Sequence, residues 1–340
     1  MCLYPRIMLN KKYTATIKNG GNIPPIPDKR VRYVPIGCGK CIECRKQKAR
    51  EWNVRLSEDI REHKNGKFIT LTFSDEKLKD LTENVQEEHA RVTEGEMLEG
   101  YDLDNAICIY AVRHWLERYR KEYGTSVRHW LITEIGHKGT KNIHMHGIVW
   151  PTESLKDTLK HWQYGYVWDG QKKNDKIINY VSERTINYIV KYMHKVDKVN
   201  QTYNPRVLCS KGIGAGYMKR TDWKNNQYKG TSTNEAYRNR QGIKRALPIY
   251  YRNKIYTETQ KEQLWIHKLD KEERWVCGEK VSIRDGQKEY ETLVEYYQKR
   301  SIELGYTPLP TWERHVYEKQ RRRIEQETRI QKAIMKQKPE

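Results

Sequence analysis

The chain has 340 residues and a mass of 40.8 kDa, a size that suits one large domain or two ordinary ones. Lysine and arginine number 65 against 44 aspartate and glutamate residues, so the formal net charge is +21. No stretch approaches the ~18 consecutive apolar residues of a membrane helix, and nothing at the N-terminus resembles a signal peptide. We therefore expect neither export nor membrane insertion. Ten Trp and 24 Tyr supply enough large side chains for a core, which argues against disorder.

The positive charge is concentrated in two blocks. Residues 1–70 carry a net charge of +10 and residues 151–256 carry +13, whereas 71–150 carry −4 and 257–340 carry +2. A basic coat that only served solubility would be spread more evenly, although a solvated basic face without a partner remains an alternative. The distribution favours a binding surface for a polyanion, nucleic acid above all.

The first half of the chain alternates between predicted loops, helices and one strand. Residues 1–36 are rich in Pro, Gly and Asn and predict an extended arm. Apolar residues recur at helical spacing over 46–63 and again over 106–123. Residues 68–73 alternate and are rich in strand formers, so they predict a strand. The acidic segment 74–104 is expected to be loop-like.

Two strands at 129–135 and 143–150 are predicted next, around a Gly-containing loop. Ser182 is a suitable N-cap for a helix over 183–198. Strands and helices mix without a strict βαβ repeat. We therefore expect an α+β fold, with a central antiparallel sheet flanked by helices.

Four regions are expected along the chain: an arm with a cysteine-rich subdomain, a central α+β domain, a basic loop region that contacts DNA, and a helical extension. Their bounds are 1–65, 66–200, 201–256 and 257–340. Lys211-Gly212-Ile213-Gly214 lacks the Gly-Lys-Ser/Thr ending of a P-loop and predicts a flexible loop, so no use of ATP is expected. In the extension, the basic run 319–323 is interleaved with glutamates and predicts a solvated helix.

His144 and His146 form a His-x-His pattern on a predicted strand. Residues two apart on a strand project from the same face, so both imidazoles can approach one cation; two hydrogen-bonded surface histidines are the alternative. If the neighbouring strand pairs antiparallel with Glu134 opposite residue 144 or 146, a carboxylate joins them, whereas a one-residue slip removes it. Such a set suits Mn²⁺ or Mg²⁺ acting on a phosphodiester, although Zn²⁺ would also accept it.

Tyr188, Tyr192 and Lys195 stand at i, i+4 and i+7 of a predicted helix and hence on one face. A phenol becomes a nucleophile when a cation or metal stabilises its phenolate or the charge on the phosphate, and Lys195 can supply that cation. An aromatic core stripe is the alternative, because Tyr119 and Tyr123 repeat the spacing without the lysine.

Cys38, Cys41 and Cys44 form a Cys-x₂-Cys-x₂-Cys run, and roughly 0.003 such runs are expected by chance from seven cysteines. Three thiolates on a tight turn have metal-ligand spacing, most simply for structural Zn²⁺. Cys2 is the preferred fourth ligand because the arm can fold back, and His63 is the second choice. Disulfides are the alternative, which a reducing cytosol disfavours.

Taken in order, these motifs resemble those of HUH endonucleases: the strand at 68–73, Glu134 with Gly136, the His-x-His strand and the Tyr-x₃-Tyr-x₂-Lys helix. The cysteine run and the Gly-Ile-Gly at 212–214 resemble more narrowly the replication initiators of small single-stranded-DNA phages, the microviruses of gokushovirus type. The catalytic part of the resemblance covers about 65–200.

This resemblance implies an HUH endonuclease fold and a rolling-circle initiator that nicks and rejoins single-stranded or origin DNA. By carry-over, His144, His146 and Glu134 would bind a catalytic Mg²⁺ or Mn²⁺, and Tyr188 and Tyr192 would form 5′-phosphotyrosine esters. Neither the order of the two tyrosines nor the preferred metal follows from the motifs. His137 and Lys191 are near enough in sequence to support these residues.

The same resemblance implies action in the cytoplasm of a bacterial host, with host helicase and DNA polymerase as partners and no use of ATP. Two other functions remain open. A non-catalytic zinc-containing nucleic-acid-binding protein would explain the charge and the cysteines but would leave the order of the other motifs to coincidence. A relaxase or transposase of the same superfamily is the nearer rival.

Overall fold

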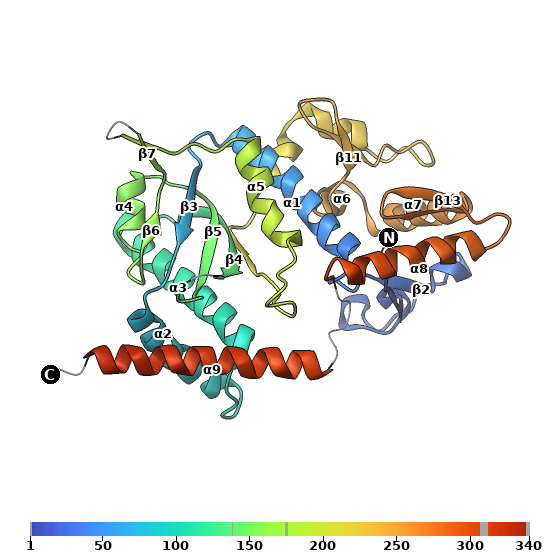
Figure 1. Cartoon of the computed structure of the whole chain (residues 1–340). Coiled ribbons are helices and arrows are strands. Elements are labelled where there is room, and N and C mark those ends of the chain that lie inside the picture. The colour runs from blue at the N-terminus through green and yellow to red at the C-terminus, as the bar shows by residue number, and fades with distance from the viewer. Residues whose placement is uncertain (1, 138, 174–175, 307–311, 338–340) are drawn as a thin grey trace. The chain divides into compact units, whose positions relative to one another are not determined.

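The computed structural model describes residues 2–137, 139–173, 176–306 and 312–337 (Figure 1). The chain forms two compact units. We call Leu56–Gly214 with Pro310–Glu340 the sheet unit, and Met1–Arg55 with Ala215–Leu309 the cysteine unit. The divisions thus follow residues 55, 214 and 309, whereas the sequence analysis placed them after 65, 200 and 256. None of the described helices is long and apolar enough to cross a membrane.

The sheet unit is built on a five-stranded antiparallel sheet of order β6-β3-β5-β4-β9. The strands are β3 (Lys67–Leu71), β4 (Arg128–Ile135), β5 (Ile143–Trp150), β6 (Val167–Trp168) and β9 (Val207–Cys209). The expected α+β class with a central antiparallel sheet is confirmed.

One face of this sheet carries the main hydrophobic core. Alternate residues such as Ile69, Leu131 and Met145 point into it and are fully buried. Helices α2 (Asp75–Val92) and α3 (Gly100–Tyr123) cover this face, with Trp115 of α3 wholly enclosed. Segment 74–104, expected to be a loop, is therefore mostly helical. Most residues of α2 are polar or charged, but Leu78, Leu81 and Val85 form a buried apolar stripe. Ser74 caps the helix by accepting a hydrogen bond from Lys77 N.

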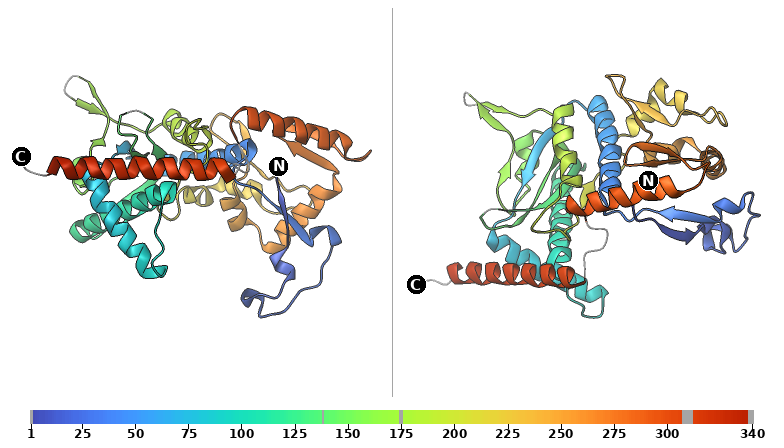
Figure 2. Two further views of the ribbon diagram at one scale, coloured as in Figure 1. Left: turned by 60° about the horizontal axis from the view of Figure 1, so that its bottom comes forward. Right: turned by 45° about the vertical axis from the view of Figure 1, so that its right-hand side comes forward.

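Helix α9 (Trp312–Gln337) packs against α2 and α3, and Figure 2 shows it crossing them. Arg322 is fully buried and bonds the equally buried Asp104, with Nε–Oδ2 at 2.7 Å. Glu318 is also buried, and its carboxylate accepts from the backbone and hydroxyl of Thr202. The predicted helix is confirmed, but it is solvated on one face only, because Glu318 and Arg322 lie on its packed face.

The opposite face of the sheet carries α5 (Glu183–His194), which contacts β4 (Figure 1). Ser182 caps α5 as predicted, and its hydroxyl and that of Thr185 form a capping box. The helix ends at His194 rather than at 198, so Lys195 is its C-cap in an extended conformation. α4 (Leu155–Leu159) and a hairpin of β7 (Gln171–Lys173) and β8 (Lys176–Ile178) complete the element order between β5 and α5.

The Gly-Ile-Gly loop at the end of the sheet unit is anchored. Asp59 accepts from Gly214 N at 2.7 Å and also pairs with Arg128, which in turn donates to Gly212 O. Ile213 is fully buried. The expected flexible loop is therefore fixed by a buried carboxylate and by its own apolar side chain.

The cysteine unit is built from two segments that are far apart in the sequence. Its first segment holds the paired strands β1 (Arg6–Leu9) and β2 (Tyr33–Ile36) and most of α1 (Ile42–Glu62). Its second segment holds β10 (Ala236–Arg238), β11 (Lys244–Ala246), α6 (Ile249–Ile255), α7 (Glu258–Asp270), β12 (Glu273–Val276), β13 (Glu279–Ser282) and α8 (Lys288–Glu303). Val54 of α1 packs with buried tyrosines such as Tyr217, Tyr237 and Tyr251 in a second core. The expected helical extension is helical in α7 and α8, with the β12–β13 hairpin between them.

Candidate functional site

Glu134, His144 and His146 meet on the α5 face of the sheet. β4 and β5 pair with Glu134 opposite His144 and Ile132 opposite His146, which is the register that the sequence analysis required. Glu134 Oε2 lies 3.0 Å from His146 Nε2 and 3.4 Å from His144 Nε2. One nitrogen from each imidazole and a carboxylate oxygen thus lie within 4.8 Å of one another, so this triad can hold a metal ion.

Other polar groups orient the ring nitrogens of the triad. Thr70 Oγ1 lies 2.9 Å from His146 Nδ1, and the Asn142 carbonyl lies 3.3 Å from His144 Nδ1, which leaves both Nε2 atoms directed at Glu134. Burial alone would raise the pKa of Glu134, but hydrogen bonds from His144, His146 and a lysine outweigh it and hold that pKa well below its usual range. Glu134 therefore presents an anionic carboxylate to the two imidazoles at neutral pH.

Lys195 and the two tyrosines approach the triad from α5. Lys195 Nζ donates to Glu134 Oε1 at 2.9 Å, the oxygen that does not face the histidines. The ring of Tyr192 stacks on that of His146, with centroids 4.8 Å apart and an interplanar angle of 15°. Tyr192 donates its hydroxyl proton to the Tyr188 oxygen at 2.6 Å. The helix thus brings two phenols and a cation beside the three candidate metal ligands.

The two tyrosines differ in environment. Tyr188 is 44% exposed, whereas Tyr192 is 8% exposed. Burial, followed by the hydrogen bond to Tyr188, raises the pKa of Tyr192. Lys191, a residue singled out in the sequence, has its Nζ 4.8 Å from the Tyr188 ring centroid. Tyr188 is therefore the accessible phenol of the pair.

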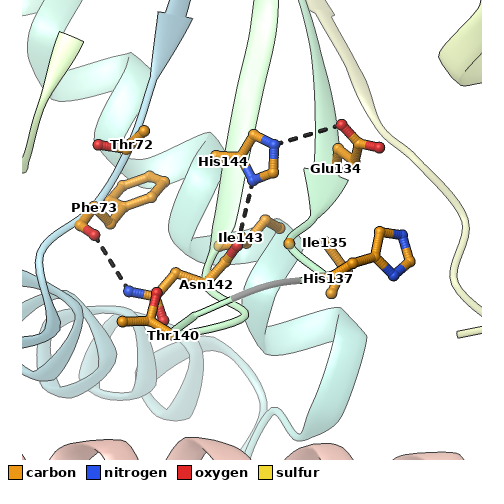
Figure 3. A pocket seen from close by; sticks show the side chains of 10 residues that line it. Thr72, Phe73, Glu134, Ile135, His137, Thr140, Asn142, Ile143 and His144 are labelled. Atoms are coloured by element: carbon orange, nitrogen blue, oxygen red, sulfur yellow. Dashed lines mark hydrogen bonds and ion pairs between the residues drawn. The ribbon is translucent and has the colours of Figure 1, made fainter. Parts of the chain in front are cut away.

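A pocket of about 520 Å³ opens beside the triad at the β4–β5 turn (Figure 3). Glu134 and His144 form its wall with Thr72, Asn142 and His137. His137 Nε2 lies 3.3 Å from Asp197, so it is an ion-pair candidate at the rim rather than a member of the triad. The volume lies in the ~300–1,000 Å³ range of small-ligand sites, so a ligand has room to reach the open side of the triad.

The four cysteines named in the sequence form a second group that can hold a metal ion: Cys2, Cys38, Cys41 and Cys44. Their sulfurs stand 3.9 Å apart for Cys2–Cys41 and 4.0 Å for Cys38–Cys44, with no disulfide among them. A tetrahedron with Zn–S bonds of ~2.3 Å has edges of about 3.8 Å, so the spacing fits four thiolates around one ion. His63 is not part of the group.

Backbone amides support these sulfurs. Tyr4 N and Cys38 N donate to Cys2 Sγ at 3.3 and 3.2 Å, and Lys40 N and Cys41 N donate to Cys38 Sγ at 3.4 and 3.3 Å. Such donors stabilise negative charge on sulfur, which is the form that binds metal. Four backbone amides therefore point at two of the four sulfurs that can hold the ion.

Two features of the triad escaped the sequence analysis. Thr70 was seen only as part of a strand, although its place between Ile69 and Leu71 puts it on the face opposite to those two apolar side chains. Gly147 was not considered at all. A Cβ there would lie 2.1 Å from the Trp130 carbonyl oxygen and 2.7 Å from Leu131 Cδ2, so a side chain would force β4 away from β5. The close pairing that carries Glu134 depends on this glycine.

Comparisons with protein-family models, with curated proteins and with solved structures found no match for this chain. The resemblance to HUH endonucleases accordingly stays a prediction made from motifs. The functional assignment rests on the residues and geometry described above.

Proposed function

We propose that this protein is a metal-dependent nickase and joining enzyme for single-stranded DNA, a rolling-circle replication initiator of the HUH type. One observation carries the proposal: Glu134, His144 and His146 share a face of the sheet with two tyrosine hydroxyls. The stacking of Tyr192 on His146 and the bond from Lys195 to Glu134 join the two halves of this arrangement. A metal ligand set beside a phenol is what transfer of a phosphodiester to tyrosine requires.

The residues of the triad fit a catalytic Mg²⁺ or Mn²⁺. They offer two imidazole nitrogens and one carboxylate oxygen, and the pocket leaves room for phosphate oxygens. Bound there, the ion would polarise the scissile phosphate and offset the charge that develops on it. Lys195, next to Glu134, adds a positive charge on the same side.

Tyr188 is the first nucleophile in this proposal. Its side chain is 44% exposed, and its hydroxyl oxygen accepts a hydrogen bond from Tyr192. The Tyr188 oxygen bonds to phosphorus while the bond from phosphorus to the 3′ oxygen breaks. The phenol proton leaves to solvent and the 3′ oxygen gains one, which yields a 3′-OH primer and a 5′-phosphotyrosine.

Tyr192 takes the second transfer. After a round of synthesis it attacks the regenerated junction in the same way, and the 3′-OH that is released attacks the Tyr188 ester. That attack forms a new phosphodiester, frees Tyr188 and closes a circle. Because the tyrosyl ester conserves the energy of the original bond, the reaction needs no ATP.

Zn²⁺ is the ion that we assign to the four-cysteine group. Four thiolate donors at tetrahedral spacing complete its coordination and leave no position for a substrate, so the role is structural. Origin DNA, host helicase and host DNA polymerase are the partners that the activity would need, in the cytoplasm of a bacterial host.

A labelled circular single strand from the cognate replicon tests the proposal. Incubation with Mn²⁺ or Mg²⁺, denaturing electrophoresis and peptide mass mapping should reveal a covalent DNA adduct on Tyr188. The adduct should disappear in Tyr188→Phe and in His146→Ala. Tyr123→Phe is the matched control, because Tyr119 and Tyr123 form the other Tyr-x₃-Tyr pair, remote from the triad in sequence and on α3; it should leave the adduct unchanged.

Salt-sensitive binding without an adduct under either metal would instead support the non-catalytic nucleic-acid-binding protein. An adduct on Tyr192 that persists in Tyr188→Phe would keep the nickase and reverse the order of the tyrosines. An adduct formed only within duplex transfer-origin or transposon-end DNA would favour the relaxase or transposase.

A further inference from the structure

Aromatic side chains line the edge of the sheet next to the triad. Trp168 of the edge strand β6 pairs with Thr70, so it lies on the face that carries His146. Tyr166 lies opposite Thr72, whose N and Oγ1 donate to the Tyr166 carbonyl at 3.0 and 2.7 Å. Because Thr72 lines the pocket beside the triad, Tyr166 stands at the border of that pocket.

The rings continue from the edge strand to the tyrosine that we propose as first nucleophile. The Trp168 ring meets that of Phe68 edge-on at 5.5 Å, and Phe68 in turn meets Tyr188 edge-on at 5.9 Å. Phe68 also stacks with His146 at 6.3 Å. A row of aromatic side chains thus leads from the pocket border to the proposed nucleophile.

Two tyrosines of this region are far more exposed than the rest of the row. Tyr166 is 70% exposed and Tyr180 is 72% exposed. Tyr180 follows Asn179, whose side chain bonds both N and O of Phe68, which places Tyr180 beside the row. Rings exposed to this degree contribute little to the core, and their faces are available to another flat group.

The surroundings suit a single nucleic-acid strand better than a strand from another protein. Asn179 already occupies the backbone N and O of Phe68, and β6 is two residues long, so little free edge remains for β-pairing. Lys172 is exposed on the adjacent hairpin, and Lys191 stands over Tyr188. Exposed rings with nearby lysines are the features that hold bases and phosphates of a single strand.

We propose that Tyr166 and Tyr180 are stacking platforms that hold bases of the single-stranded substrate beside the scissile phosphate. The proposal rests on the proposed function for the identity of the strand, but its contacts are separate from the transfer chemistry. Stacking is tolerant of base identity, so these rings would add affinity rather than choose the origin sequence.

Binding of a fluorescently labelled 20-mer of thymidylate, measured by anisotropy with EDTA present so that no cleavage occurs, tests the platform. Tyr166→Ala and Tyr180→Ala should each weaken binding roughly 5- to 150-fold, the range of base–aromatic stacking at ~1–3 kcal/mol per base. The Phe variants should bind like the wild type, because they keep the ring. Lys172→Ala should instead reduce the dependence of binding on salt.

Tyr317→Ala is the matched control, because Tyr317 is 58% exposed and lies on α9 of the same unit. It should bind as tightly as the wild type. If the two alanine variants bind like this control, the platform is overturned, even where the wild type forms its covalent adduct. If they lose binding and no adduct forms in the wild type with metal, the platform stands and the nickase proposal fails.

Discussion

The two groups that can hold a metal ion are built in opposite ways. The cysteine group takes its four sulfurs from residue 2, from the turn before α1 and from the first turn of α1, and backbone amides donate to Cys2 and Cys38. The triad takes three ligands from two paired strands, and one side faces a pocket of about 520 Å³. Four donors close a coordination sphere, whereas three leave it open to substrate.

The two groups therefore depend on different features of the structure for the positions of their candidate ligands. The cysteine group depends on local spacing, since Cys38, Cys41 and Cys44 lie within seven residues. The triad depends on register, since Glu134 reaches the histidines only because β4 and β5 pair without a slip. We therefore expect an ion that is retained at the first group and one that exchanges at the second.

The largest expected effect comes from removing the exchangeable ion. Dialysis against EDTA should reduce formation of the covalent DNA adduct roughly a thousandfold or more, because several kcal/mol of charge stabilisation are lost. Added Mn²⁺ should restore it, while elemental analysis still finds about one zinc per chain. Loss of zinc together with activity, and recovery only with zinc, would show that the contrast between the two groups is mistaken.

The second-largest effect is expected at the four-cysteine group. Cys41→Ser should reduce the zinc content from roughly one per chain to none, because the remaining three thiols leave the ion incompletely coordinated. The midpoint of thermal unfolding should fall by roughly 10 °C, at about 2–4 °C per kcal/mol. Elemental analysis and calorimetry measure the two changes. Cys209→Ser is the control, since Cys209 lies on β9 outside the group, and a variant that keeps its zinc would refute the assignment.

A third variant should weaken metal binding by the triad without removing any of its three candidate ligands. Thr70→Val deletes the hydroxyl that bonds His146 Nδ1, so the imidazole loses its orienting partner. The Mn²⁺ concentration for half-maximal adduct formation should rise about 10- to 100-fold, as is typical when such a partner is lost. Thr93→Val at the end of α2 is the control, because its hydroxyl bonds the His89 carbonyl and it does not line the pocket. Equal shifts in both variants would argue against a role for the Thr70 hydroxyl.

The smallest effect on metal binding is expected at Lys195. Its ammonium bonds Glu134 Oε1, not the oxygen that faces the histidines, and it is 42% exposed. Lys195→Met should therefore change the Mn²⁺ requirement by less than about fivefold, because a partly exposed ion pair contributes ~0.2–1 kcal/mol. A metal titration of adduct formation measures this. A larger shift would mean that Lys195 belongs to the ligand environment itself.

Much of the triad could be predicted from the sequence because its signals are local. The alternation around His144 and His146, the strand bearing Glu134 and the cap at Ser182 all lie within a few residues of the motifs that reveal them. The register of β4 against β5 could be stated only as a condition for Glu134 to join the two histidines. It depends on packing across the sheet, where Gly147 admits the Trp130 carbonyl.

Two helices, α9 and α2, were predicted less well, because their polar composition gave no sign of the residues that they bury. The polar run of α9 contains Arg322, which looks like a surface residue until Asp104, 218 residues away in sequence, is found beside it. The helix α2 was missed because its acidic residues outnumber its three buried apolar ones. The different exposure of Tyr188 and Tyr192 could not be foreseen either, since it depends on how α5 is rotated against β5.

Gly147 also has a consequence for recognising distant relatives of this chain. Since no side chain fits between the Trp130 carbonyl and Leu131, a protein that keeps this pairing of β4 and β5 must keep a glycine directly after its second histidine. The useful search pattern is therefore His-x-His-Gly on a strand, with a glutamate on the preceding strand, rather than the two histidines alone. Substitution of this glycine within an otherwise similar sequence would indicate a different geometry at the triad.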